Sequence, residues 1–142
     1  MITPEGVVVS DSFAIAAEMH SSFGGLRGGW PVNLRHSFTG AVAPPAIEAK
    51  LDRLVIIWSN TLAKTGSKGA RLCGNYCIAD VIFAPMAARL ATYVFDTRPT
   101  SKAYVAAYLA DPAFQKWRAD GLVLDPVMPN FEANLPTALW PV

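Results

Sequence analysis

The sequence predicts an all-α fold, a bundle of about five helices followed by an extended, proline-rich C-terminal tail. Apolar residues recur at steps of three and four in several segments, which is the period of one face of a helix. Proline and glycine stand where these helices would begin and end. The segment Leu122–Val142 carries Pro126, Pro129, Pro136 and Pro141, and prolines favour an extended path over a long helix.

The first expected helix starts near Phe13, where Ser10–Ser12 offers N-cap candidates. A short β-branched run, Gly6–Val9, precedes it. Its apolar face consists of Ile15, Met19, Phe23, Leu26 and Trp30. Gly24-Gly25 and Gly28-Gly29 would each cost about 0.8–1 kcal/mol per glycine relative to alanine, so a break or kink is expected there.

A second helix begins at Pro44-Pro45 and ends at Gly66, with one apolar face made of Ile47, Leu51, Leu54, Val55, Trp58 and Leu62. The third, Ile78–Tyr93, is apolar nearly all round, which is typical of a central, buried helix. The fourth spans Lys102–Leu109. The fifth spans Pro112–Ala119, with Asp111 as N-cap and Gly121 as a stop signal.

The composition suits one domain with surplus apolar surface. The chain has 142 residues, of which 52% are apolar and 16% charged, and its mean hydropathy is positive. Large apolar patches are rarely left in water, so the surplus predicts a subunit interface, a ligand cavity or both. We therefore expect a hydrophobic small-molecule ligand and a homodimer or other self-association.

Charge and hydropathy argue against two other classes of partner. With a net charge of +1 and no Lys/Arg cluster, the sequence predicts no basic surface patch that would bind nucleic acid. The most apolar stretch, Val81–Phe95, is too short and interrupted to span a membrane. Cys73 and Cys77 lie too close in sequence to link distant segments, and with no N-terminal secretory pattern this favours a cytoplasmic location.

Three groups of motifs lie between about Ala17 and Gly121. They are Glu18–Phe23 with Leu26-Arg27 and Pro31–Arg35, Tyr76–Asp80 with Phe83–Pro85 and Arg89–Tyr93, and Asp111–Trp117. Together they resemble bacterial glutathione S-transferases: the first group resembles the opening helix of that family's C-terminal domain, the second its buried central helix, and the third a later helix.

The family's central helix opens with a Ser or Thr N-cap and an Asp three positions later, a reciprocal capping box. Asp80 matches this Asp, but Cys77 stands at the cap. A thiol is a poor acceptor, so we expect the start of the helix to be weakened by about 1 kcal/mol.

A second resemblance lies at the N-terminus. Gly6–Ala16 resembles the last strand and following helix of the family's thioredoxin-like domain, so residues 1–16 are interpreted as its remnant and 17–142 as the helical domain. The resemblance implies that Asp11 and Ser12 match the acidic-Ser pair that contacts the glutamyl end of glutathione; the alternative for Ser12 is an ordinary N-cap. The unit carrying the thiol-activating residue has no counterpart, so glutathione is a possible but not an expected cofactor.

The resemblance also implies that the helical domain forms the pocket for an apolar co-substrate. Candidate substrate-binding residues are Met19, Phe23, Arg27, Arg89 and Tyr93, and candidate catalytic residues are Arg89, Tyr93 and His20. Met19 and Phe23 have plain core packing as their alternative, and His20 a surface position. Tyr93 is either an acid or base or a core ring with a bonded hydroxyl.

Arg89 lies in an otherwise apolar helix, where an arginine is rarely buried unless it forms an ion pair or binds an anion. An ion pair with Glu18 is the favoured interpretation and a ligand contact the alternative. Cys73 and Cys77 do not predict a metal site, because His20 and His36 are the only imidazoles and form no second ligand pair.

Three hypotheses for function remain open. In the first, the chain is related to glutathione transferases and binds a hydrophobic small molecule, or acts on it as an enzyme, without ordinary thiolate activation. Alternatively it is a non-catalytic binding or dimerisation module. In the third hypothesis it is a truncated transferase, and the catalytic activity belongs to its complete ancestor.

Overall fold

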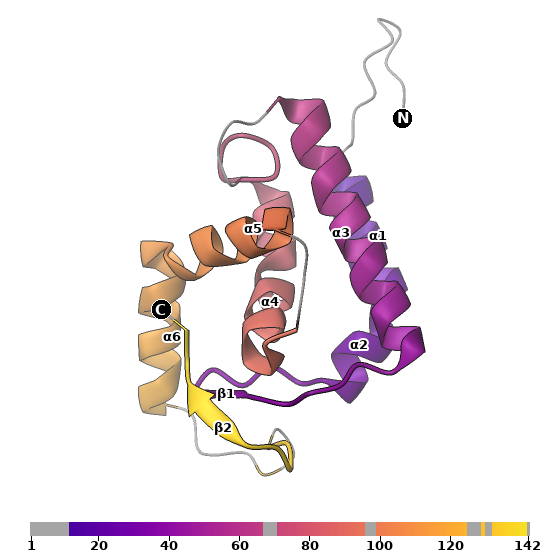
Figure 1. Ribbon diagram of the computed structural model, residues 1–142. Helices are drawn as coiled ribbons and strands as arrows, with labels where there is room; N and C mark the ends of the chain where they lie inside the picture. The colour runs from indigo at the N-terminus through magenta and orange to yellow at the C-terminus, as the bar shows by residue number, and fades with distance from the viewer. Residues whose placement is uncertain (1–11, 67–70, 96–98, 125–128, 130–131, 142) are drawn as a thin grey trace, which may run out of the picture.

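The computed structural model describes residues 12–66, 71–95, 99–124, 129 and 132–141. Within those ranges the chain is mostly helical, with six helices and one sheet of two short strands (Figure 1). The predicted all-α class is confirmed at this level. The strand expected at Gly6–Val9 and most of the remnant expected at 1–16 lie outside the described residues.

The first predicted helix is two helices, α1 (Ser12–Ser22) and α2 (Gly24–Gly29). The break falls at Phe23, directly before the first glycine pair, and both glycine pairs are helical. The side chains of Phe23 and Leu26 are fully buried. Burial of two large apolar side chains contributes a stabilisation of the same size as the cost of the four glycines, so the short helix persists.

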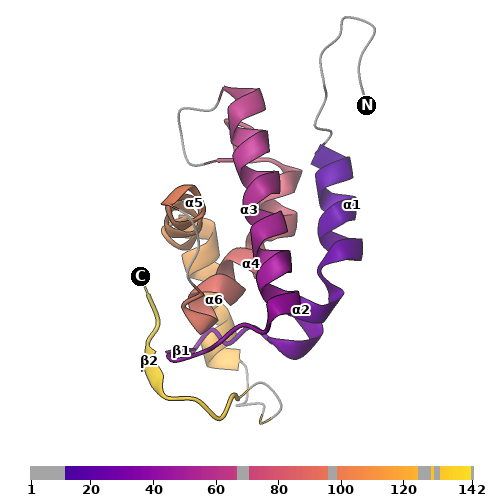
Figure 2. The ribbon, with the colours of Figure 1, turned by 45° about the vertical axis from the view of Figure 1, so that its right-hand side comes forward.

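The two longest helices confirm their sequence predictions. Helix α3 (Pro45–Thr65) begins at a proline and ends at Gly66, which adopts the left-handed conformation with φ 61°. Helix α4 (Ile78–Tyr93) lies at the centre of the bundle, against α1 on one side and α5 on another (Figure 2). Nearly every residue from Phe83 to its end is buried.

The start of α4 has the predicted capping box despite the cysteine at its cap. The Cys77 backbone N–H donates to the Asp80 carboxylate at 3.0 Å, and the reciprocal contact runs from the Asp80 amide to the Cys77 side chain. Asp80 is fully buried. One half of the box is thus made by a carboxylate, a strong acceptor, and the other by a weak one.

Helices α5 (Pro99–Leu109) and α6 (Pro112–Leu124) follow. Asp111 caps α6 as predicted, its Oδ1 accepting from the amides of Ala113 at 2.9 Å and Phe114 at 3.3 Å. The stop at Gly121 was wrong, because α6 continues to Leu124. A glycine inside a helix costs only about 1 kcal/mol relative to alanine, which does not end a helix without a left-handed turn.

The tail differs from its prediction at its start, because residues up to Leu124 are helical. Further on, Thr137–Leu139 is extended and forms strand β2, which pairs antiparallel with β1 (His36–Phe38). Neither strand was predicted. Trp140, 7% exposed, packs in the apolar cluster next to α4. The tail therefore lies on the bundle through a strand pair and one buried tryptophan.

Apolar clusters lie on two sides of α4. The larger is centred on Phe23, Trp58 and Phe83, and joins α1, α3 and α4. The smaller contains Ala88, Phe114 and Trp140 and joins α4 to α6 and the tail. Among the described helices, none is long and apolar enough to cross a membrane.

Candidate functional site

A pocket of about 510 Å³ opens between α2, the C-terminal end of α4 and the tail. This volume lies within the usual range for small-molecule sites. It is lined by Arg27, Gly28, Gly29, Trp30, Pro31, Tyr93, Glu132 and Ala133. Two residues predicted to bind substrate, Arg27 and Tyr93, are thus brought together from segments that are far apart in the sequence.

Tyr93, the last residue of α4, forms one wall of the pocket. Its ring meets that of Trp30 edge-to-face at 4.9 Å between centroids, and its hydroxyl donates to the Pro31 carbonyl at 2.9 Å. Burial raises the pKa of Tyr93; the charge of Arg89 opposes this shift and that of Glu132 adds to it. At neutral pH the hydroxyl is therefore protonated and acts as a hydrogen-bonding group, not as a base.

Arg27 projects from α2 and is partly buried. Its guanidinium donates to the backbone carbonyl of His20 at 2.5 Å, which ties α2 to the end of α1. The side chain of His20 is exposed and does not line the pocket, as its surface alternative anticipated. The structure thus brings Arg27 to the pocket and leaves His20 outside it.

The predicted ion pair between Arg89 and Glu18 was wrong. Glu18 accepts from Arg53 of α3 at 2.7 Å instead. Arg89 is 6% exposed and donates to two backbone carbonyls, Trp30 at 2.5 Å and Pro85 at 3.3 Å. Arg53 lies at the surface within reach of Glu18, whereas Arg89 is buried against the segment that follows α2.

Burial lowers the pKa of Arg89 to about 10; the neighbouring Tyr93 opposes this shift and the positive charge of Arg27 adds to it. Arg89 does not line the pocket, but it binds the carbonyl of Trp30, which does. Its guanidinium therefore lies directly behind the pocket wall.

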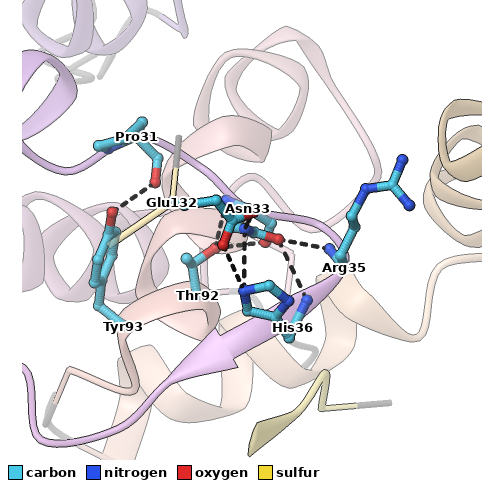
Figure 3. A network of polar contacts seen from close by, with 7 residues as sticks. All are labelled: Pro31, Asn33, Arg35, His36, Thr92, Tyr93 and Glu132. Atoms are coloured by element: carbon cyan, nitrogen blue, oxygen red, sulfur yellow. Dashed lines mark hydrogen bonds and ion pairs between the residues drawn. The ribbon is translucent and has the colours of Figure 1, made fainter. Parts of the chain in front are cut away.

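A network of polar contacts holds the tail against the other side of the pocket (Figure 3). Glu132 accepts from Asn33 Nδ2 at 3.1 Å, and its second oxygen lies 3.1 Å from His36 Nε2. Glu132, Asn33 and His36 were not among the predicted site residues. No sequence signal could have joined them, because Glu132 is separated from Asn33 by 99 positions.

Asn33 is the centre of that network and is 5% exposed. Its side-chain oxygen accepts from the amides of Arg35 at 2.8 Å and His36 at 3.3 Å, which fixes the turn before β1. Its backbone N–H donates to Thr92 Oγ1 on α4 at 3.2 Å, and the Thr92 hydroxyl donates to the Asn33 carbonyl at 2.9 Å. Loop, tail and central helix are thereby held together beside Tyr93 (Figure 3).

The remaining predicted residues do not reach the pocket. Met19 and Phe23 are buried in the larger apolar cluster, which was the alternative for both. Asp11 lies outside the described residues, and so does the side chain of Ser12, although its backbone begins α1.

Two further cavities are more apolar. A groove of about 500 Å³ runs between α4, α5 and β2, lined mainly by apolar side chains such as Leu90, Val105 and Leu139. A smaller pocket of about 350 Å³ lies between α4 and α6, next to Trp117. Neither combines aromatic rings with two opposite charges, as the pocket beside Tyr93 does.

Cys73 and Cys77 lie in the segment before α4 and are both free. Burial and a hydrogen bond with Cys77 raise the pKa of the Cys73 thiol to about 11. In the part of the chain that the structure describes, no three His, Cys, Asp or Glu side chains could together hold a metal ion.

No family model, curated protein or solved structure matches the chain. The chemistry of the pocket beside Tyr93 is therefore the guide to function.

Proposed function

We propose that the chain is a helical domain of the glutathione-transferase C-terminal type that binds a hydrophobic small molecule in the pocket beside Tyr93. The single observation that carries the proposal is this pocket, which joins Arg27, Trp30 and Tyr93. A few convergent polar groups next to aromatic rings are typical of small-molecule sites.

The proposed ancestry has support in three helices. The motif-bearing helices α1 and α4 pack side by side, and the Asp80 half of the family-like capping box is made at 3.0 Å. Asp111 caps α6 in the third motif. Helices α1, α4 and α6 carry residues of the three groups of motifs that resemble glutathione transferases.

Binding is the proposed activity, and it does not depend on glutathione. The hydroxyl of Tyr93 is engaged by the Pro31 carbonyl, and the pocket lining, in the part of the chain that the structure describes, includes neither of the residues, Asp11 and Ser12, that the resemblance matches to glutathione contacts. Calorimetric titration with glutathione is therefore expected to show no binding tighter than a millimolar dissociation constant. A micromolar constant would contradict this part of the proposal.

The pocket itself is tested with two probes of the same shape, 2-naphthoate and the neutral 2-naphthamide. We expect at least one of them to bind the full chain with a submillimolar Kd. Trp30→Leu should weaken that binding at least tenfold, because the ring that lines the pocket is removed. Trp117→Leu is the matched control, since Trp117 lines the cavity between α4 and α6. Loss of binding in the control alone would move the site to that cavity.

A second candidate, a dimerisation module, is favoured by exposed apolar side chains around the groove between α4, α5 and β2. Leu139 is 94% exposed and Val94 60% exposed. Light scattering behind size exclusion tests this candidate. A monomer at every concentration would remove it, while a dimer dissociated by Leu139→Glu would support it.

A further inference from the structure

Two arginines beside the pocket have only backbone carbonyls as hydrogen-bond acceptors in the part of the chain that the structure describes. Arg27 lines the pocket and donates to the carbonyl of His20, while Arg89 donates to the carbonyls of Trp30 and Pro85. Among the described residues, neither arginine forms an ion pair. Carbonyl oxygens satisfy N–H groups but carry only partial charge. Two full positive charges therefore lie at one end of the pocket.

The burial of Arg89 makes this arrangement unusual. An arginine as buried as this one, at 6% exposed, is rarely found without an anionic partner, because a charge loses its hydration on burial. The charge of Arg27 also disfavours the charged form of Arg89, which indicates that the two guanidinium groups lie close enough to repel each other. An anion bound beside Arg27 would relieve both costs.

Glu132, the acidic residue of the pocket, does not supply that anion. Its two carboxylate oxygens are engaged by Asn33 and His36, each at 3.1 Å, on the side where the tail meets the loop. Its carboxylate is held in the network that joins the tail to the loop. The arginine end of the pocket keeps its positive charge.

The rings determine the shape of molecule that fits. Trp30 and Tyr93 line the pocket and meet edge-to-face at 4.9 Å between centroids. Trp30 is half-buried and leaves part of its ring open to a flat ligand, while Tyr93 is 2% exposed and supports that ring from behind. A planar guanidinium binds a carboxylate through two parallel hydrogen bonds.

From these contacts we infer that the ligand of this pocket is an aromatic carboxylate. Arg27 binds the carboxylate directly, Trp30 contacts the aromatic body with Tyr93 packed behind it, and Arg89 strengthens the positive field from behind the wall. This inference rests on the proposed function, that the pocket holds a small molecule, and adds the chemical class of that molecule.

Calorimetry with 2-naphthoate and 2-naphthamide on the full chain tests the inference. Wild-type protein should bind the carboxylate at least tenfold more tightly than the amide, and added salt should reduce that ratio because the interaction is between charges. Arg27→Gln should bring the ratio close to one. Arg53→Gln, which removes an arginine from the exposed pair with Glu18, should leave it unchanged.

The outcomes separate the two proposals. Equal binding of both probes by the wild type would overturn the carboxylate inference and leave the proposed function standing. No binding of either probe would overturn both. A tenfold preference that survives in Arg27→Gln would show that the carboxylate binds elsewhere, and would also overturn the inference. Arg27 is only partly buried, so the variant is expected to fold, which circular dichroism checks.

Discussion

The carboxylate of Asp80 accepts a hydrogen bond from the hydroxyl of Tyr104 at 3.2 Å, and both side chains are buried. The same carboxylate accepts from the amides of Cys77 at 3.0 Å and Leu72 at 3.4 Å. One buried carboxylate thus joins the start of α4, the preceding segment and α5. Burial, and then the charge and hydrogen bond of Asp80, hold the pKa of Tyr104 well above its usual range.

Removing the hydroxyl of Tyr104 should destabilise the fold. We expect Tyr104→Phe to lower the free energy of unfolding by about 1–2 kcal/mol, because Asp80 loses one of its donors. Asp80→Ala should cost more, since it leaves two amides and a hydroxyl without their acceptor. Urea denaturation measures both. The control is Asp52→Ala on the exposed side of α3, expected within about 0.5 kcal/mol of the wild type; equal effects in all three variants would refute the prediction.

Alanine in place of two glycines, one inside a helix and one at a helix C-cap, should change the free energy of unfolding in opposite directions. Gly121 lies inside α6 with open space where the Cβ atom of an alanine would lie, so Gly121→Ala should raise the free energy of unfolding by about 0.5–1 kcal/mol. Gly66 has φ 61°, so Gly66→Ala should lower it by about 1 kcal/mol. Thermal unfolding compares the pair, and a stabilised Gly66→Ala would contradict the assigned cap.

Alkaline pH should destabilise the protein through Cys73. Burial and Cys77 raise the pKa of its thiol from 9.0 to about 11, so below pH 9 both the folded and unfolded states keep the proton. Above pH 9 the unfolded state loses its proton first, and the free energy of unfolding falls as pH rises.

The effect of Cys73 on the free energy of unfolding is best measured in the window from pH 9 to about 10. Above it Tyr108, whose pKa burial raises to about 12, adds to the decline, while Arg89, whose pKa is lowered to about 10, opposes it. Denaturant titrations at intervals across this window should give a shallower slope for Cys73→Ser than for the wild type. Identical slopes would exclude Cys73 as the cause.

Neutralising Glu132 should strengthen binding of a carboxylate in the pocket. Its charge acts on Tyr93, so it also opposes an anion placed there. We expect Glu132→Gln to lower the Kd of 2-naphthoate severalfold and to leave that of 2-naphthamide unchanged. Calorimetry at low salt measures both, and equal changes for the two probes would point to a displaced tail instead of an electrostatic effect.

Local signals were enough to predict the longest helices. Helix α3 begins at a proline and ends at a glycine with positive φ, and α4 carries its own cap residues, so both sets of bounds follow from neighbouring positions. The same kind of signal failed at Gly121, where a glycine without a left-handed turn did not end the helix.

Distant partners decided most of the site. Arg89 was recognised from the sequence as an unusual buried cation, but its predicted partner Glu18 was taken by Arg53, which only the packing of α3 beside α1 brings near. Glu132 is held at the pocket by contacts with His36 and Asn33, which are 96 and 99 positions away in the sequence.

By itself, then, the sequence determined the helical class, the bounds of α3 and α4 and two residues of the pocket, Arg27 and Tyr93. The tertiary structure alone decided the β1–β2 pair, the network at Glu132 and the absence of an ion pair at Arg89 among the described residues. The physical reason is range. Caps and apolar periodicity act over a few residues, whereas a charge or a hydrogen-bonding group pairs with whichever partner the packed chain brings within about 3 Å.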